Sequence, residues 1–347
     1  MIGDVLASTV ICEVLKQKYP QAQIDYLIYP NTAAVVEGNP FIDHLVIFEQ
    51  EYKTSKKAFW RFLKRIRKQK YNLVVDAYGK TESNLISLCS RAPKRVSYRK
   101  WYTRFFYTHT IDRKGVVLTA AGNAIENRLR LVASEDVIKN DPIRPKIFLS
   151  ENEKNDAKKR ILSYQIDLQK PLIMIGILGS SRIKSLPPET MAKIIDRISE
   201  KTQGSILLNY IPSQINEVRE IYDLTAQESK KHIYFDLYGK SLREFLAITS
   251  HCNMLIGNEG GAVNMAKALN IPTFTIFSPW INKDAWNMFE NGSDQVSIHL
   301  SDFEPALYED KSAKVYKDEA NELYKKLSPD RILPLLDIYL DNNIAQN

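Results

Sequence analysis

The sequence predicts an α/β protein made of two doubly wound, Rossmann-like domains. Short β-branched or aromatic runs alternate with helical patterns, which is typical of parallel sheets covered by helices on both faces. The length of 347 residues favours two domains over one or three, since a domain commonly has roughly 100–200 residues. Hydrophobic residues make up 44% of the chain and charged residues 26%, so the composition excludes a disordered, collagen-like or coiled-coil protein.

The expected strands form two groups along the chain. Those of the first half are Gln23–Ile28, Leu45–Phe48, Leu73–Asp76 and Arg95–Tyr98, and those of the second half are Leu172–Leu178, Ser205–Asn209, Ile233–Phe235, Met254–Ile256 and Thr273–Phe277. Between the groups, residues 140–171 contain Pro142, Pro145 and a charged helical stretch from Glu151, which we interpret as a linker region. We expect domains at 1–150 and 151–328, and a C-terminal helix in 329–347 that crosses back to the first domain.

The beginning of the chain departs from the doubly wound pattern, in which a strand precedes the first glycine-containing turn. Gly3 and Asp4 already resemble that turn, and Val5–Lys18 has the pattern of the helix after it. We therefore expect that a first strand is missing and that the natural chain begins roughly ten residues upstream.

Charge is distributed unevenly between the two halves. Residues 1–150 carry 25 Lys and Arg against 14 Asp and Glu, whereas the remainder carries 23 against 27. Nine of the basic residues, and no acidic one, lie in Lys53–Lys70, where aromatic and aliphatic residues recur at helical spacing. Such a segment is either a packed helix with a solvated basic face or a contact for anionic lipid at the inner membrane. Nucleic acid is not expected as a partner, because no recognition-helix, RNP-like or zinc-finger pattern accompanies the charge.

Several classes of site are not expected from this sequence. The longest apolar stretch, Pro171–Leu178, is far shorter than a membrane-spanning helix, which needs roughly 20 residues. The first residues lack a basic leader, so we expect a cytoplasmic protein. Neither the three cysteines nor the five histidines have metal-ligand spacing, and we expect no metal and no cofactor.

A glycine-rich turn lies between a strand and a helix in residues 254–269. Gly260 and Gly261 have no Cβ, so an anionic ligand can approach the free backbone N–H groups at the start of the helix. We interpret this turn as a candidate diphosphate cradle. The alternative is that the glycines only form a tight turn and Glu259 only caps the helix.

Two other segments carry candidate binding or catalytic groups. Residues 179–189 follow the most apolar strand and contain Ser180, Ser181 and Lys184, which suit a phosphate-binding rim; the alternative is a solvated loop. The segment is not a Walker A loop, because the order of its residues is wrong. Asp4, at the head of the first helix, is a candidate catalytic carboxylate or an ordinary helix cap.

Together, these segments resemble a known family. Ile2–Leu6, Tyr19–Pro20, Ile24–Leu27 and Glu37–Pro40 are similar to the N-terminal half of the lipopolysaccharide heptosyltransferases of glycosyltransferase family nine. The resemblance continues in order and spacing over nearly the whole chain, through Val75–Asp76, Ala124–Leu129, Gly179–Pro187 and Ile256–Pro279.

The resemblance implies a GT-B fold, in which two Rossmann-like domains face a cleft. It implies that Asp4 is the general base, that Ser180, Ser181 and Lys184 hold the donor phosphates, and that Gly260 and Gly261 lie under the diphosphate. It also implies that Glu217 contacts the nucleoside. Three positions depart from the family pattern: Glu259 and Asn264 stand where the family usually has Asp and His, and Leu186 stands where Trp is expected.

From this resemblance we expect an inverting glycosyltransferase that moves heptose from ADP-heptose onto an anionic glycolipid acceptor of the lipopolysaccharide-core type. The binding site for the donor would then include Glu259 and Asn264 as well. Two alternatives stay open at this stage. One is a transferase or epimerase that uses another nucleotide sugar, and the other is a catalytically silent protein of the same fold that binds at the membrane surface.

Overall fold

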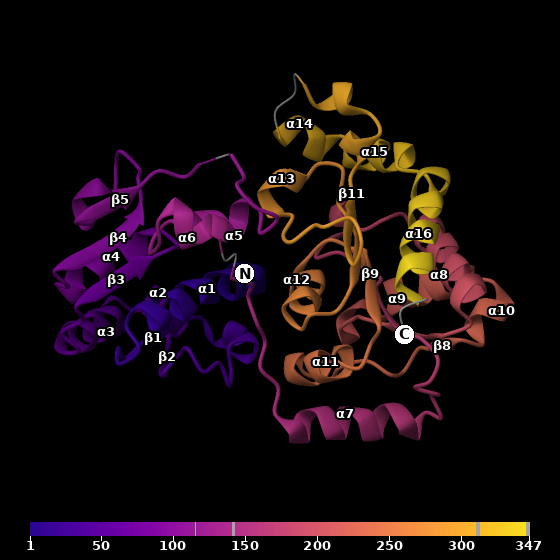
Figure 1. Ribbon diagram of the computed structural model, residues 1–347, viewed down its shortest axis with the longest axis horizontal. Helices are drawn as coiled ribbons and strands as arrows, with labels where there is room; N and C mark the ends of the chain where they lie inside the picture. The colour runs from indigo at the N-terminus through magenta and orange to yellow at the C-terminus, as the bar shows by residue number, and fades with distance from the viewer. Residues whose placement is uncertain (115, 141–142, 310–312, 345–347) are drawn as a thin grey trace. The chain divides into compact units, whose positions relative to one another are not determined.

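The computed structural model describes residues 1–114, 116–140, 143–309 and 313–344 (Figure 1). The chain divides into two compact units. The N-terminal unit comprises residues 4–145, and the C-terminal unit comprises residues 146–347, with which residues 1–3 are grouped. Pro142, part of the expected linker, lies outside the described residues. The domain limits expected from the sequence stay predictions.

The N-terminal unit contains two short parallel sheets. One pairs β1 (Asp25–Ile28) with β2 (His44–Ile47), and the other has the order β3 (Leu73–Asp76), β4 (Lys94–Tyr98), β5 (His109–Ile111). Its helical elements are α1 (Ile2–Lys18), η1 (Pro30–Val35), α2 (Glu51–Thr54), α3 (Lys56–Lys68), α4 (Thr81–Ser90), η2 (Arg104–Phe106), α5 (Asn123–Leu129) and α6 (Glu135–Asn140).

No ladder of hydrogen bonds joins these two sheets within the described residues. A side-chain hydrogen bond connects β1 to the segment before β3: the Tyr71 hydroxyl donates to Asp25 Oδ2 at 2.6 Å. Most residues of β1 and β3 are only half-buried. The expected extra strand before α1 stays a prediction.

The C-terminal unit contains one six-stranded parallel sheet with the order β11-β10-β9-β6-β7-β8. Taken in chain order, its first strand lies at the centre and the order reverses between β6 and β9, which is the doubly wound Rossmann arrangement. The strands are β6 (Leu172–Gly176), β7 (Ser205–Leu208), β8 (Ile233–Tyr234), β9 (Met254–Asn258), β10 (Thr273–Ile276) and β11 (Gln295–Ile298). The expected fold class is confirmed.

Helices surround this sheet. They are α7 (Glu151–Ser163), η3 (Arg182–Lys184), α8 (Pro188–Thr202), η4 (Pro212–Gln214), α9 (Ile215–Leu224), α10 (Gln227–Lys230), α11 (Leu242–Thr249), α12 (Gly261–Ala268), α13 (Lys283–Trp286), η5 (Leu300–Asp302), η6 (Pro305–Tyr308), α14 (Ala313–Asp318), α15 (Ala320–Lys326) and α16 (Pro329–Ile344). Because both faces of the sheet are covered, every residue of β6, β7, β9 and β10 is buried.

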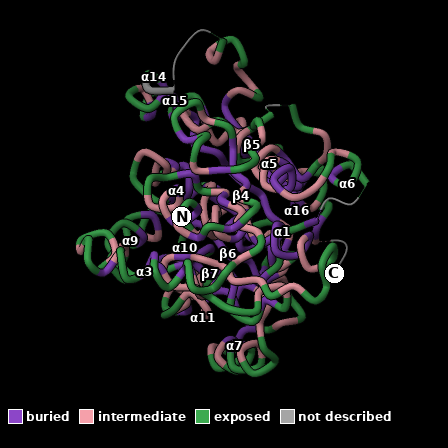
Figure 2. Tube along the Cα trace, turned by 90° about the vertical axis from the view of Figure 1, so that its left-hand side faces the viewer, coloured by how far each residue is buried: buried purple, intermediate pink, exposed green. Residues whose placement is uncertain are grey.

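Two peripheral helices are tied to the C-terminal unit by charged side chains. On α8, Arg197 forms a bidentate ion pair with Asp337 of α16: its Nε donates to Oδ1 at 2.8 Å and its Nη2 to Oδ2 at 2.6 Å. The apolar face of α16 packs into the same core as the sheet. Helix α7, largely exposed in Figure 2, starts with a capping box of Ser150 and Glu153. Arg243 of α11 donates to both carboxylate oxygens of Glu153 and holds α7 in place.

Candidate functional site

A pocket of about 180 Å³ opens at the carboxyl ends of β6, β7 and β9. In doubly wound sheets, ligands bind outside the strand ends at the point where the strand order reverses, and here that point lies between β6 and β9. The residues that line the pocket are Gly176, Leu178, Gly179, Ser180, Asn209, Tyr210, Ile211, Gln214, Asn258, Glu259, Gly260, Gly261 and Ala262.

The turn from β9 into α12 forms one wall of the pocket. Gly260 precedes the helix with φ 153° and ψ −162°, a conformation that disfavours residues with a Cβ, and no atom lies within 4 Å of where its Cβ would stand. The first N–H groups of α12 therefore lie beneath open space. Such a helix start attracts anions, because its N–H groups are unpaired and the helix dipole is positive there.

Asn258, the last residue of β9, joins the sheet to the opposite wall. Its Nδ2 donates to the carbonyl oxygens of Gly176 and Ile177, both at 3.0 Å, and its Oδ1 accepts from the Leu186 N–H at 2.8 Å. Asn258 is 4% exposed. A single buried amide therefore positions both the end of β6 and the end of the 179–187 segment.

The 179–187 segment is folded tightly by its own hydrogen bonds. The Ser185 hydroxyl accepts from the Gly179 N–H at 2.9 Å and donates to the Ser181 carbonyl at 3.0 Å. The same carbonyl accepts from the Lys184 N–H at 2.9 Å, which closes the η3 turn. The fold of this segment therefore fixes the position from which the Lys184 side chain extends.

The Lys184 side chain reaches the glycine turn. Its Nζ lies 3.6 Å from Glu259 Oε1 and 5.4 Å from the centre of the Trp280 ring. Trp280 is held in turn by a 2.8 Å hydrogen bond from its Nε1 to the Ile183 carbonyl. Glu259 Oε1 is buried and accepts no hydrogen bond among the described residues. The cation at the rim of the pocket is therefore placed by a carboxylate and an aromatic face.

The structure brings together most of the residues predicted for donor binding. Ser180, Glu259, Gly260 and Gly261 line the pocket, and Lys184 contacts Glu259. Glu217 and Asn264 do not line the pocket: Glu217 is exposed in the first turn of α9, and Asn264 lies half-buried in α12. Ser181, also absent from the lining, contributes its carbonyl to the turn described above.

The wall of the pocket that follows β7 was not predicted from the sequence. Asn209, Tyr210, Ile211 and Gln214 line the pocket there. The Tyr210 ring packs 4.6 Å from the ring of Tyr238, and its hydroxyl donates to the Phe235 carbonyl at 3.0 Å. Burial is the main cause that raises the pKa of Tyr210 to about 12, so this phenol is a neutral wall of the pocket.

In the N-terminal unit, Asp4 lies in the first turn of α1 and forms an ion pair with Arg128. Arg128 Nη2 donates to Asp4 Oδ1 at 2.9 Å, and Arg128 Nε donates to the Ser8 hydroxyl at 3.0 Å. The Ser8 hydroxyl donates in turn to the Asp4 carbonyl at 2.7 Å. The Asp4 side chain is 29% exposed and that of Arg128 is 12% exposed. The carboxylate is therefore oriented but still accessible.

Asp76 stabilises the turn after β3 through hydrogen bonds. It is 6% exposed and accepts hydrogen bonds from the Tyr78 and Gly79 N–H groups, both at 2.8 Å, and from the Tyr107 hydroxyl at 2.6 Å. Burial, followed by the neighbouring Tyr29 hydroxyl, raises the pKa of Tyr78, and the charge of Asp4 adds a smaller contribution in the same direction. Asp76 therefore holds the turn that carries Tyr78 into the neighbourhood of Asp4.

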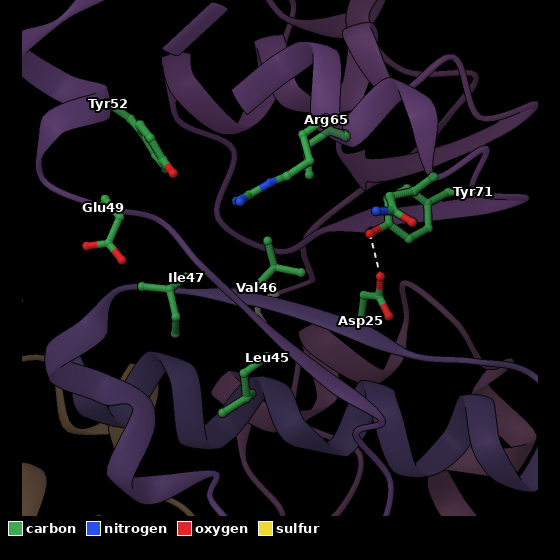
Figure 3. Close-up of a pocket in the computed structure, with 10 residues that line it drawn as sticks. Asp25, Leu45, Val46, Ile47, Glu49, Tyr52, Arg65 and Tyr71 are labelled. Carbon is green, nitrogen blue, oxygen red and sulfur yellow. Dashed lines mark hydrogen bonds between the residues drawn. The ribbon is translucent and has the colours of Figure 1, made fainter. Parts of the chain in front are cut away.

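A larger pocket, of about 330 Å³, lies in the N-terminal unit between β2 and α3 (Figure 3). Arg65 extends over it from α3, and the hydrogen-bonded Asp25 and Tyr71 close one end. None of the predicted site residues lines this pocket. Within the described part of the chain, no cluster of His, Cys, Asp or Glu could hold a metal ion, and no helix is long and apolar enough to span a membrane.

A Rossmann sheet with a glycine turn and a lysine at its switch point is typical of proteins that bind a nucleotide or another phosphate compound. Comparison with known families narrows this class. The model of glycosyltransferase family 9 (heptosyltransferase) matches residues 59–306, well over half of the chain. The chain belongs to glycosyltransferase family 9, and the predicted family and enzyme class are confirmed.

Individual relatives agree with this assignment. The chain is 23% identical over 301 residues to lipopolysaccharide heptosyltransferase 3 of Escherichia coli, covering 81% of this chain and 84% of the relative. A solved glycosyltransferase of family 9 from Veillonella parvula is similar with a TM-score of 0.81 and 18% identity, covering 98% and 94% of the two chains. An Escherichia coli heptosyltransferase solved with ADP-2-deoxy-2-fluoro heptose has a TM-score of 0.61 and 13% identity, covering 86% and 90%.

Proposed function

We propose that this glycosyltransferase moves a heptose from ADP-heptose to a hydroxyl of a lipopolysaccharide-core acceptor, with inversion at the anomeric carbon. The observation that carries the proposal is the pocket at the β6/β9 switch point, where the start of α12 and Lys184 supply positive potential to a diphosphate. The family membership and the ADP-sugar on a similar solved structure support the choice of donor.

The donor site accounts for departure of the diphosphate. Negative charge builds on the leaving oxygen as the bond to the sugar breaks. The N–H groups at the start of α12 stabilise that charge, and so does the Lys184 ammonium, because both are in place before the reaction. The Ser180 hydroxyl lines the same pocket and donates to a phosphate oxygen.

Asp4 is proposed as the general base. Its carboxylate accepts the proton of the acceptor hydroxyl while the hydroxyl oxygen attacks the anomeric carbon from the face opposite the diphosphate. Arg128 donates to one carboxylate oxygen, Oδ1, and anchors the α1 turn through Ser8, so that Asp4 keeps one orientation. Arg128 is therefore a positioning residue for Asp4.

The experiment that tests this proposal compares Asp4→Asn with the parent enzyme, using ADP-heptose and a heptose-deficient core acceptor. General-base catalysis typically contributes 10²- to 10⁴-fold, so we expect kcat to fall by about that factor while the affinity for ADP stays unchanged. NMR of the product should show the inverted anomer. Transfer by Asp4→Asn at the parent rate would disprove the role of Asp4.

The donor is tested separately with a panel of nucleotide sugars. We expect ADP-heptose to raise the melting temperature most, since a ligand at 100 times its Kd stabilises the folded state by about 2.7 kcal/mol. Glu259 and Asn264 differ from the usual family residues, so a larger shift with another nucleotide sugar would reassign the donor. An absence of transfer with every donor would instead favour a silent binding protein.

Peripheral contact with the inner membrane is part of the proposal. A glycolipid acceptor is anchored in a bilayer, so the enzyme must work at its surface. The nine cations of Lys53–Lys70 are the proposed contact for the anionic groups of that surface.

A further inference from the structure

Helix α3 presents an aromatic ring in the middle of a cationic face. Lys57, Trp60, Arg61, Lys64 and Lys68 follow the helical spacing of one stripe, and all five are exposed. The opposite side of α3 carries Phe62, Leu63 and Ile66, which are buried in the core of the unit. The stripe is therefore not needed to pack the helix.

The charge on this stripe is little neutralised. Among the described residues, Arg61 pairs with Glu51 at 3.7 Å, and both side chains are more than 60% exposed. No ion pair is found for Lys57, Lys64 or Lys68 within that part of the chain. Trp60 itself is 61% exposed. A large aromatic ring surrounded by free cations is an arrangement suited to the headgroup region of a membrane.

A second element with the same chemistry lies between β4 and β5. Trp101 is 86% exposed, Phe105 67% and Tyr102 54%, and the exposed Arg104 lies among them. Two backbone hydrogen bonds shape the segment: Thr103 N–H donates to the Lys100 carbonyl at 3.1 Å, and Phe106 N–H donates to the Thr103 carbonyl at 3.0 Å. Two successive turns therefore hold three large aromatic side chains in solvent.

Helix α4 connects these two elements. It packs against α3 and also against η2, which carries Phe105. Leu88 of α4 and Arg91, which follows α4, are also exposed. The acidic groups nearby are Glu51, paired with Arg61, and Asp112, paired with Arg99 at 3.2 Å; Glu82 in the first turn of α4 is a third.

We propose that the 99–106 turn inserts its aromatic rings into the interfacial layer of an anionic bilayer while the α3 stripe binds the lipid phosphates beside it. This inference rests on the proposed function, because it gives the lipid-anchored acceptor its membrane context. Charge favours an anionic surface, and three projecting rings on one turn favour a surface that accepts apolar groups. A bilayer has both properties, whereas a nucleic acid offers no apolar layer.

The proposal is tested by sedimentation of the full chain with vesicles, without any transfer reaction. Vesicles of phosphatidylcholine mixed with phosphatidylglycerol are compared with vesicles of phosphatidylcholine alone. We expect binding to the mixed vesicles, falling with added salt, and much weaker binding to the neutral ones. A Lys or Arg at an anionic surface contributes roughly fivefold, so Lys57→Glu/Lys64→Glu should weaken binding by at least roughly 25-fold.

The aromatic turn is tested with Trp101→Ser/Phe105→Ser, which should weaken vesicle binding roughly tenfold while the variant still melts like the parent. Lys158→Glu/Lys193→Glu provides the matched charge control, because both lysines are exposed in the C-terminal unit; Trp286→Ser, 41% exposed in the parent, is the aromatic control. Both controls should bind like the parent.

Three results would overturn the inference: parental vesicle binding by the Trp101/Phe105 variant, equal binding of the parent to neutral and anionic vesicles, or binding to a single-stranded oligonucleotide in place of vesicles. A further measurement separates this inference from the proposed function. With a water-soluble acceptor fragment, the Trp101/Phe105 variant should transfer sugar at the parent rate. Loss of that activity with unchanged vesicle binding would make the turn an acceptor site instead.

Discussion

Gly179→Ala should disable the donor site by displacing Lys184. A Cβ built on Gly179 would stand 2.7 Å from the carbonyl carbon of Lys184 and 3.0 Å from its Cβ. Carbon atoms in contact prefer roughly 3.5–4.0 Å, so the segment that carries Lys184 must move by roughly 1 Å. A misplacement of that size can cost about 10²-fold in rate, and we expect a comparable loss in kcat/KM for the donor.

The assay measures ADP binding by calorimetry and sugar transfer at a temperature where the variant is fully folded. Gly239→Ala is the matched control, since its Cβ would overlap the backbone of Phe245 at 2.5 Å, and Gly239 does not line the donor pocket. Both variants should melt at a lower temperature than the parent, but only Gly179→Ala should lose ADP affinity. Parental ADP binding by folded Gly179→Ala would refute the link between this glycine and Lys184.

Three further substitutions test other parts of the structure. Gly261→Ala should fold normally, because its Cβ would meet only Met265 Cε at 4.0 Å. It should nevertheless weaken ADP binding if a diphosphate lies on the turn. Thermal melting measures the first effect and calorimetry the second. Glu126→Ala should lower the free energy of unfolding in urea by about 3–5 kcal/mol, since Glu126 is fully buried, pairs with Arg130 at 3.1 Å and accepts from the Leu118 and Thr119 N–H groups. The hydrogen bond from Arg243 is the main cause that lowers the pKa of Glu153 from its ordinary value of 4.5 to about 2. The ion pair between Glu153 and Arg243 therefore stabilises the fold fully above about pH 5, and this contribution is lost as the pH falls toward 2. Because both side chains are partly exposed, the contribution is about 1–2 kcal/mol. Urea unfolding of Glu153→Gln at several pH values should lack this pH-dependent part of the stability.

The buried strands were predictable from the sequence, whereas two edge strands, β5 and β11, were not predicted. Strands such as β6 and β9 are continuous apolar runs that are buried on both faces, so composition alone marks them. β11 has the sequence Gln-Val-Ser-Ile, and its polar residues are buried because Gln295 hydrogen-bonds Thr273 on the neighbouring strand. β5 has only three residues, His109–Ile111, too few for a period to appear.

The candidate site was predictable where its chemistry is local in the sequence. Gly260 and Gly261 stand together in one turn, and Ser180 and Lys184 lie in one loop, so a local pattern reveals them. Arg128 could not be assigned in this way, since it lies 124 positions from Asp4 and only the fold makes them partners. The same holds for Asn258 and Trp280, whose partners in the 179–187 segment are 72 and 97 positions away.

The two small sheets of the N-terminal unit should influence which part of the protein unfolds locally first. A two-stranded pair such as β1 with β2 is only marginally stable alone, whereas the sheet of the C-terminal unit is deeply covered. Local opening follows the least protected backbone. Amide protons of β1 and β3 should therefore exchange with deuterium well before those of β6 and β9, and binding of a nucleotide should widen that difference.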